Sequence, residues 1–196
     1  MAKRSQQQPR TRWPRSSENK GALGNKPGAP FPFLGGSYYT RVVAKKRVFI
    51  TKSPSSTKKL GEILGEEARR HFNKKKTALC FALEGDLGAG KTLFTKGVAH
   101  GLGITRTITS PTFVLAKRYP ISKSHFRNLW HIDCYRIKKP AELDVLGWKN
   151  IIRDPKNILV VEWANQIKKY LPPKPARIIF SHEAPKIRKI TFYEDR

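Results

Sequence analysis

The sequence predicts a three-layer α/β fold of one domain, with a mainly parallel central sheet and antiparallel edge strands. Two observations lead to this prediction. Short apolar runs of strand length alternate with segments of helical periodicity from about residue 41 onwards. One strand-like run leads through a glycine-rich loop into a helix, and two later runs end on acidic residues. The 196 residues are enough for one such domain and a tail.

The glycine-rich loop at residues 85–92 reads Gly-Asp-Leu-Gly-Ala-Gly-Lys-Thr and fits G-x-x-x-x-G-K-[ST], the phosphate-binding loop of P-loop NTPases. An apolar run at 77–83 precedes it, and apolar residues at helical spacing follow it: Leu93, Phe94, Val98 and Leu102. The glycines let backbone N–H groups turn toward an anion, and the helix N-terminus adds unpaired donors. We expect Lys91 to reach the β- and γ-phosphates and the Thr92 hydroxyl to ligate Mg²⁺. The motif therefore predicts a bound nucleoside triphosphate in a P-loop NTPase-like fold.

The first 40 residues are predicted to be a disordered basic tail in front of a domain that spans residues 41–196. The tail is rich in Arg, Lys, Gln, Ser, Pro and Gly. Its composition suggests a mitochondrial transit peptide, but its prolines argue against the amphipathic helix that such a peptide needs. Two alternatives stay open: an arm that binds nucleic acid through Trp13 and the neighbouring arginines, or an over-extended translation start.

The domain is predicted to begin with an edge strand and a helix. Residues 41–51 have a strand pattern whose lysines would protect an exposed edge from aggregation. The capping residues at 53–57 place the start of the helix near Thr57. Its apolar face contains Leu60, Ile63, Leu64, Ala68 and Phe72.

The helix after the glycine-rich loop is predicted to stop near Gly101. Pro111 keeps the residue before it out of the helical region, so this segment is expected to be extended or turning. Strands are then predicted over 114–119 and 129–135, and a short helix over 141–148.

Three strands complete the predicted sheet. Residues 157–163 form a nearly continuous apolar run, which is typical of a central strand covered on both faces. Residues 177–180 and 190–193 are predicted to be final, antiparallel strands.

The formal net charge of +26 is extreme for a small enzyme. Residues 1–47 hold 11 Lys/Arg and one acid, and the rest of the chain holds 29 against 13. Because both the tail and the domain are basic, the charge favours a polyanionic neighbourhood, such as tRNA or an acidic partner. A lineage whose proteins are generally rich in lysine explains the charge equally well.

Two cysteines, Cys80 and Cys134, each lie in an apolar, strand-like run. They are too few for a disulfide framework or a zinc site, so buried thiols in a reducing cytosol are predicted. No apolar run approaches the roughly 18 residues of a membrane span, and the start does not resemble a secretory signal. We therefore expect a cytoplasmic protein with no membrane partner.

Two predicted strands end on acids, Asp133 and Glu162. Ligands of open α/β sheets bind beyond the carboxyl ends of the strands. An acid there can hold Mg²⁺ directly or through water, or orient an attacking water. Either acid alone could be a solvated strand end, but together with the phosphate loop they indicate a functional site.

Four blocks of the sequence together resemble the TsaE (YjeE) family of bacterial P-loop ATPases. In chain order they are Gly85 to Thr92, Ser110-Pro111-Thr112-Phe113, His131-Ile132-Asp133-Cys134-Tyr135-Arg136, and Glu162-Trp163. The phosphate loop is common to many NTPases, whereas the combination of blocks is specific. The resemblance runs from about Val48 to Tyr193 and excludes the tail.

The resemblance implies an ATPase that is required for threonylcarbamoylation of adenosine 37 in tRNAs that read codons starting with A. Its cofactors would be ATP and Mg²⁺. Its partners would be a TsaB–TsaD-like complex, which stimulates hydrolysis. Contact with tRNA would be indirect, with direct contact through the basic surface as the alternative.

The resemblance also implies roles for individual residues. The nucleotide-binding residues would be Asp86, Leu87, Gly88, Ala89, Gly90, Lys91, Thr92 and Thr112. Thr112 would be a switch residue that senses the γ-phosphate. The metal would lie at Thr92, Asp133 and Glu162, and catalysis would depend on Lys91, Asp133 and Glu162. Asp133 resembles the Walker-B-type acid, and Glu162 resembles the acid near Mg²⁺ and the attacking water.

Other matching residues are assigned less sharply. Trp163 resembles the functional tryptophan of the family, with ordinary packing as the favoured alternative. His131 is expected to be a buried strand residue with its hydrogen bonds satisfied. Tyr135 and Arg136 match the motif without an assigned step. The segment 53–57 is implied to lie against the adenine.

Two other functions fit parts of the sequence. One is a small-molecule or nucleoside kinase on the same scaffold, although the segment between Asp133 and Glu162 is short for a lid. The other is a non-catalytic RNA-binding module that uses the basic surface. In addition, the basic tail and the uncharged residues 164–166 depart from the pattern of the family.

Overall fold

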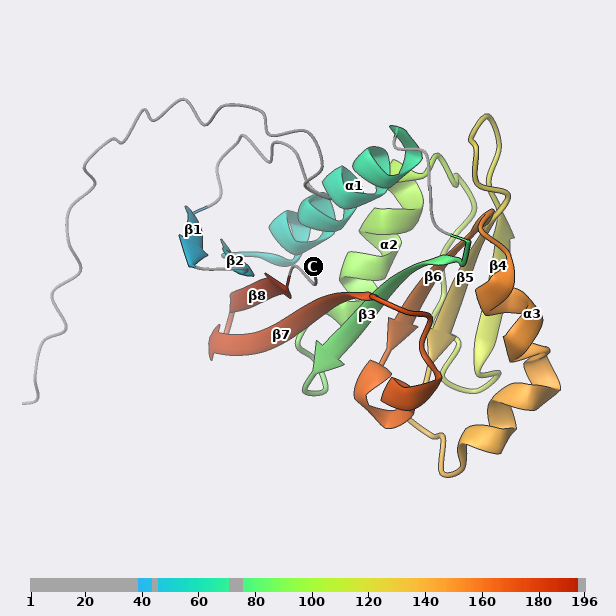
Figure 1. Ribbon diagram of the computed structural model, residues 1–196. Helices are drawn as coiled ribbons and strands as arrows, with labels where there is room; N and C mark the ends of the chain where they lie inside the picture. The colour runs from blue at the N-terminus through green and yellow to red at the C-terminus, as the bar shows by residue number, and fades with distance from the viewer. Residues whose placement is uncertain (1–38, 44–45, 71–75, 194–196) are drawn as a thin grey trace, which may run out of the picture.

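The computed structural model describes residues 39–43, 46–70 and 76–193, and these form one eight-stranded sheet with helices on both faces (Figure 1). The strands are β1 (Tyr39–Val43), β2 (Lys46–Thr51), β3 (Leu79–Gly85), β4 (Ala116–Pro120), β5 (Asn128–Asp133), β6 (Asn157–Glu162), β7 (Ala176–Ala184) and β8 (Ile187–Tyr193). Their order in the sheet is β1-β2-β8-β7-β3-β6-β5-β4. The predicted disordered tail, residues 1–40, lies almost entirely outside the described residues.

The centre of the sheet is parallel and its flanks are antiparallel. Strands β7, β3, β6 and β5 are joined by parallel pairings. The pairings that join β1, β2, β8 and β7 on one flank, and β4 to β5 on the other, are antiparallel. The predicted fold class is confirmed, including the antiparallel pairing of the last two strands.

One predicted strand was wrong in its extent. Residues 41–51 were expected to form a single edge strand, but they contribute to two antiparallel strands, β1 and β2. Val43 pairs with Lys46, and the two strands run in opposite directions. As a result β1 forms the edge, and β2 is paired on both sides.

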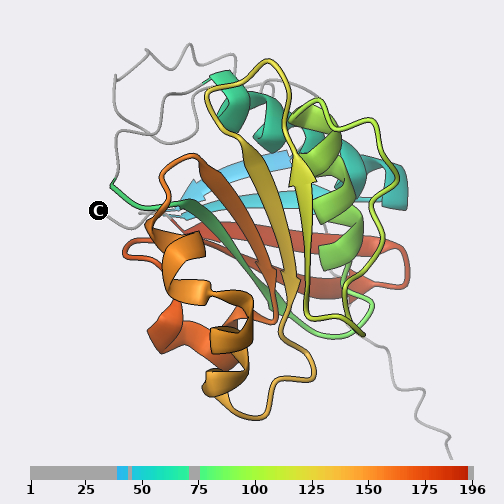
Figure 2. The ribbon, with the colours of Figure 1, turned by 90° about the vertical axis from the view of Figure 1, so that its right-hand side faces the viewer.

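The helices cover the two faces of the sheet (Figure 2). Helices α1 (Pro54–Arg70) and α2 (Lys91–Gly101) lie on one face. The 3₁₀ helices η1 (Pro140–Leu146) and η2 (Ala164–Tyr170) and the helix α3 (Trp148–Arg153) lie on the other. This arrangement gives the expected three layers. In the described part of the chain, every helix is too short or too polar to cross a membrane.

Two helix predictions need correction. Helix α1 begins at Pro54 rather than near Thr57, because the Ser53 side chain accepts a hydrogen bond from the Ser56 N–H (3.1 Å) and proline fits the first helical position. The helix expected over 141–148 is divided in two: η1 ends at Leu146, Gly147 follows with a positive φ of 67°, and a separate helix α3 begins at Trp148. Glycine adopts this left-handed conformation without the penalty of a Cβ, so the break occurs there.

Each face of the sheet has its own apolar core. The core under α1 and α2 contains Leu60, Leu64, Phe94, Val98 and the inward side chains of the central strands. The opposite core contains Leu143, Trp148 and Ile151 packed against Leu159 and Val161 of β6. The prediction that β6 is covered on both faces is therefore confirmed, since all six of its residues are buried.

Four glycines allow α1 and α2 to pack side by side as parallel helices. A Cβ at Gly61 would lie 2.2 Å from the carbonyl oxygen of Phe94, and one at Gly65 would lie 2.2 Å from that of Val98. Conversely, a Cβ at Gly97 or Gly101 would lie 2.0 Å from a carbonyl oxygen of α1. A Cβ does not approach a non-bonded oxygen this closely, so the two helices can lie this near to each other only with glycine at these positions. The packing brings the first turns of both helices to the same end of the sheet.

The substitution Gly97→Ala should destabilise the protein although alanine is the better helix former. The added Cβ would push α1 and α2 apart, and overpacking of this kind costs about 1–3 kcal/mol. Urea unfolding of the full chain measures the change in free energy. The matched control is Lys96→Ala, an exposed change on the same helix, for which a change within about 0.5 kcal/mol is expected. Equal stability of Gly97→Ala and the unsubstituted protein would refute the account of the helix pair.

Both cysteines are buried and neither forms a disulfide, as predicted. Burial, with a smaller contribution from the charge of Asp133, raises the pKa of Cys134 to about 12. Since only the thiolate attacks alkylating reagents, we expect Cys134 to resist iodoacetamide at pH 8 in the folded protein and to react after unfolding in urea. Mass spectrometry of the alkylated peptide measures this. Rapid labelling of Cys134 in the folded chain would contradict the buried placement.

Candidate nucleotide-binding site

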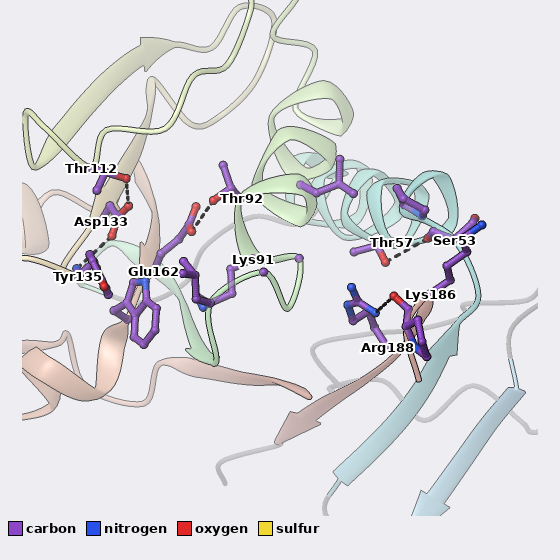
Figure 3. A pocket seen from close by; sticks show the side chains of 17 residues that line it. Ser53, Thr57, Lys91, Thr92, Thr112, Asp133, Tyr135, Glu162, Lys186 and Arg188 are labelled. Carbon is purple, nitrogen blue, oxygen red and sulfur yellow. Dashed lines mark hydrogen bonds between the residues drawn. The ribbon is translucent and has the colours of Figure 1, made fainter. Parts of the chain in front are cut away.

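The parallel strands β3, β6 and β5 end at the same edge of the sheet, beside the first turns of α1 and α2. A cavity of about 420 Å³ lies there (Figure 3). Its walls come from the phosphate loop, from Ser53 and Thr57 of the α1 start, from the ends of β5 and β6, and from the turn between β7 and β8. Figure 3 shows the side chains of Lys91, Thr92 and Glu162 toward one end, and those of Ser53 and Lys186 toward the other.

The phosphate loop depends on three glycines with positive φ: Gly85 (131°), Gly88 (73°) and Gly90 (102°). A Cβ at Gly85 would lie 2.2 Å from the carbonyl oxygen of Phe180 in β7. Gly90 is the N-cap of α2 and offers no side-chain cap, so the amides of the first helical turn remain available to an anion. The loop therefore has the geometry that its sequence predicts.

Lys91 is folded back onto the loop. Its Nζ donates hydrogen bonds to the carbonyl oxygens of Gly85 (2.6 Å) and Asp86 (2.7 Å), and it lies 4.0 Å from the centre of the Trp163 ring. Burial lowers the pKa of Lys91, and the carboxylates of Glu162, Asp133 and Asp86 offset part of that effect. The ammonium group thus lies at the floor of the cavity, among acceptors that a phosphate could replace.

Glu162 accepts hydrogen bonds at both carboxylate oxygens. Thr92 Oγ1 donates to Oε2 (2.7 Å), and His131 Nε2 lies 2.7 Å from Oε1. Thr95 Oγ1 lies 3.4 Å from Oε1 and donates to the carbonyl oxygen of Lys91 (3.0 Å). Glu162 is only 2 % exposed, so these contacts hold its carboxylate in one orientation next to the phosphate loop.

Asp133 is hydrogen-bonded to the segment that contains Thr112. Thr112 Oγ1 donates to Asp133 Oδ2 (2.5 Å), and Ser110 Oγ lies 3.4 Å from the same oxygen. The backbone N–H of Tyr135 donates to Oδ1 (3.0 Å). The acid at the end of β5 therefore fixes the position of the segment around Thr112.

The structure brings most of the predicted site residues into one cavity. Those that line it are Leu87, Gly88, Gly90, Lys91, Thr92, Thr112, Asp133 and Glu162. Ala89 is a fully buried residue of the loop, and the carbonyl oxygen of Asp86 accepts a hydrogen bond from Lys91. The Thr92 hydroxyl donates its hydrogen bond to Glu162.

The prediction for His131 was wrong in one respect. The side chain is fully buried in β5, as expected, but its hydrogen bonding is incomplete: Nδ1 has no partner among the described residues. The other ring nitrogen contacts Glu162, so the histidine belongs to the site rather than to the core alone. Trp163 also belongs to it, because its ring contacts both Lys91 and Tyr135.

Sequence reasoning missed two groups of side chains. Thr95 lies one helical turn after Thr92, and this spacing was the available signal. Pro185 and Lys186 of the β7–β8 turn, and Arg188 at the start of β8, also line the cavity. No motif marks them, because their position depends on how the antiparallel flank pairs with the rest of the sheet.

The side chains of Thr92, Asp133 and Glu162 suit Mg²⁺ bound together with a nucleoside triphosphate. A threonine hydroxyl and two carboxylates supply the oxygen ligands that Mg²⁺ prefers. Within the described residues, no group of three or more His, Cys, Asp or Glu side chains forms a metal cage of its own. Such a site suits a cation that is shared with phosphate oxygens rather than one enclosed by protein.

Comparison with known proteins agrees with this geometry. Residues 51–190 match the sequence model of the family described as threonylcarbamoyl adenosine biosynthesis protein TsaE. The TsaE protein of Bacillus subtilis is 37 % identical over 142 residues, covering 72 % of this chain and 82 % of the relative. That of Haemophilus influenzae is 33 % identical over 138 residues, covering 70 % and 75 %. The crystal structure of YdiB from Bacillus subtilis aligns with a TM-score of 0.56 at 30 % identity, covering 81 % of this chain and 88 % of that one.

Proposed function

This chain belongs to the TsaE family, and on that premise we propose that it is a Mg²⁺-dependent ATPase that serves threonylcarbamoylation of adenosine 37 in tRNAs reading A-starting codons. Its family makes it a protein of threonylcarbamoyladenosine biosynthesis. The observation that carries the proposal is the hydrogen bond of 2.7 Å between Thr92, in the phosphate loop, and the buried Glu162 at the end of β6. This contact joins a phosphate-binding element to an acid suited to hydrolysis.

Nucleotide binding would use the two ends of the cavity. The loop amides from Asp86 to Thr92 and the start of α2 would hold the phosphates. Lys91 would exchange its loop carbonyl partners for β- and γ-phosphate oxygens. The adenine would lie toward Ser53 and Lys186, at the far end of the cavity.

Hydrolysis would use the two strand-end acids. Bound Mg²⁺ would neutralise charge on the phosphates, and Thr92, Asp133 and Glu162 would hold it. Glu162 would also orient the attacking water, and its hydrogen bond with the proposed Mg²⁺ ligand Thr92 supports this role. Thr112, bonded to Asp133, would sense the γ-phosphate as a switch residue.

The acceptor of the phosphoryl group would be water rather than a small molecule. A kinase on this scaffold needs a lid, and the segment between Asp133 and Glu162 would have to supply it. That segment instead packs against the sheet through Leu143 (1 % exposed) and Trp148 (3 % exposed). The structure therefore supports hydrolysis over the kinase alternative.

A TsaB–TsaD-like complex would stimulate the ATPase by docking beside the cavity. Large apolar side chains are exposed in the phosphate loop and directly after the cavity-lining Thr112: Leu87 (75 %), Phe113 (83 %) and Val114 (57 %). Phe113 also lies 4.6 Å below the guanidinium of Arg136, and aromatic residues with arginine are typical of binding hot spots. Contact with tRNA would be through these partners. Because tRNA is the molecule that is modified, the activity would take place in the cytoplasm.

The substitutions Lys91→Ala and Glu162→Ala separate binding from hydrolysis. Lys91→Ala should abolish ATP turnover, because the phosphates lose their only buried cation among the described residues. Glu162→Ala should lower kcat by about 100-fold or more while sparing much of the ATP affinity. Phosphate release and binding of a fluorescent ATP analogue measure the two effects, with Lys96→Ala as the control on α2. Normal hydrolysis by either variant would overturn the site assignment.

The substitution Phe113→Asp tests the proposed docking surface. A charge there should weaken association with the purified TsaB–TsaD complex by at least about 10-fold, because a hot-spot residue contributes about 2 kcal/mol or more. Val145→Asp is the matched control, since Val145 is 90 % exposed on η1, away from the cavity lining. Affinity is measured by biolayer interferometry with ATP present. Equal losses for both variants, or none for Phe113→Asp, would contradict docking at the mouth of the cavity.

A further inference from the structure

His131 is a buried ionisable residue for which the proposed mechanism has no step. It lies in β5, two residues before Asp133, and none of its surface is exposed. Side chains alternate along a strand, so His131 and Asp133 point to the same face of the sheet. In the parallel register Asp133 is opposite Glu162, and His131 is opposite Val160. The imidazole thus lies one step behind the carboxylate pair, deeper in the molecule.

The ring contacts the site through one nitrogen only. His131 Nε2 lies 2.7 Å from Glu162 Oε1, while Nδ1 has no hydrogen-bond partner in the described part of the chain. A hydrogen on Nδ1 would leave a buried donor without an acceptor, which costs about 1–3 kcal/mol. A hydrogen on Nε2 has an acceptor, the carboxylate. The contacts therefore select the tautomer in which Nε2–H donates to Glu162.

Three side chains contact the Glu162 carboxylate, and they differ in distance and in the oxygen that they contact. Thr92 is bonded to Oε2 and is itself a proposed metal ligand, so this contact would change when Mg²⁺ binds. Thr95 is 3.4 Å from Oε1, a long contact, and its hydroxyl also donates to the backbone of Lys91. His131 is left as the short contact to Oε1, from a neighbouring strand rather than from the phosphate loop.

We propose that His131 is a positioning residue, whose Nε2–H fixes the orientation of the Glu162 carboxylate toward the phosphate loop. This inference rests on the proposed ATPase function. Its physical basis is that a buried carboxylate with one fixed oxygen has one remaining direction for the other oxygen, which here faces Thr92. A histidine that only filled space would bury its polar ring nitrogens at a cost in free energy that no hydrogen bond offsets. Supporting residues of this kind typically contribute about 10- to 100-fold to activity.

The tautomer can be observed directly in the unsubstituted protein. The chain is labelled with ¹⁵N, and a long-range ¹H–¹⁵N spectrum distinguishes protonated from bare ring nitrogens. The His131 signals are those missing from the spectrum of His131→Gln. We expect a hydrogen on Nε2. A bare Nε2 would overturn the proposal, since the ring could not donate to Glu162.

Two substitutions at His131 then separate the hydrogen bond from the volume of the ring. The amide of His131→Gln can donate to Oε1, whereas His131→Phe fills the space without a donor. We expect His131→Phe to lose about 10- to 100-fold in kcat with little change in KM for ATP, and His131→Gln to recover much of the loss. Leu129→Val is the control, because Leu129 is fully buried on the same face of β5 and lies in the apolar core. It should lower the melting temperature without lowering kcat.

The outcomes distinguish a positioning role from a structural one. A normal kcat in His131→Phe would overturn the proposal. So would equal losses of kcat in His131→Gln and His131→Phe, provided that both variants melt at or above the temperature of Leu129→Val. Failure of the unsubstituted chain to hydrolyse ATP would instead refute the proposed function. In that case the ¹⁵N spectrum would still decide whether His131 donates to Glu162.

Discussion

The parallel alignment of β3, β6 and β5 is the constraint on which the site depends. In this register Leu83 is opposite Glu162, and Glu162 is opposite Asp133, so the phosphate loop and both acids leave the sheet at the same edge. The residues involved are far apart in the sequence: Thr92 and Glu162, which are hydrogen bonded, are separated by 70 positions. A shift of one residue in either pairing would turn an acid to the opposite face and remove it from the cavity.

The helix pair supplies the second half of the arrangement. Because Gly61, Gly65, Gly97 and Gly101 allow α1 and α2 to touch along their backbones, both helices begin at the cavity. The partial positive charge of two helix N-termini is thereby directed toward one region, which favours an anionic ligand. The buried acids bring negative charge to the same region. Burial lowers the pKa of Lys91, and these nearby carboxylates offset part of that effect.

The predictable parts of the structure were those encoded by local pattern. The phosphate loop was read from its glycines and its Lys-Thr pair, and β6 from a continuous apolar run, because a few adjacent residues determine each of them. The break at Gly147 and the two strands within 39–51 were missed, since periodicity alone does not place a reversal of the chain. The contacts of His131 and Thr95 with Glu162, and the cavity wall at Lys186, arise from the packing of distant elements and have no local signature.

The central claim is that Thr92, Asp133 and Glu162 surround the metal of a bound nucleotide. A crystal structure with Mg²⁺ and a non-hydrolysable ATP analogue tests it most directly. The account predicts the triphosphate on the loop from Asp86 to Thr92, with Mg²⁺ at the Thr92 hydroxyl and within one water molecule of both acids. A nucleotide bound outside this cavity, or a metal far from both carboxylates, would contradict the account.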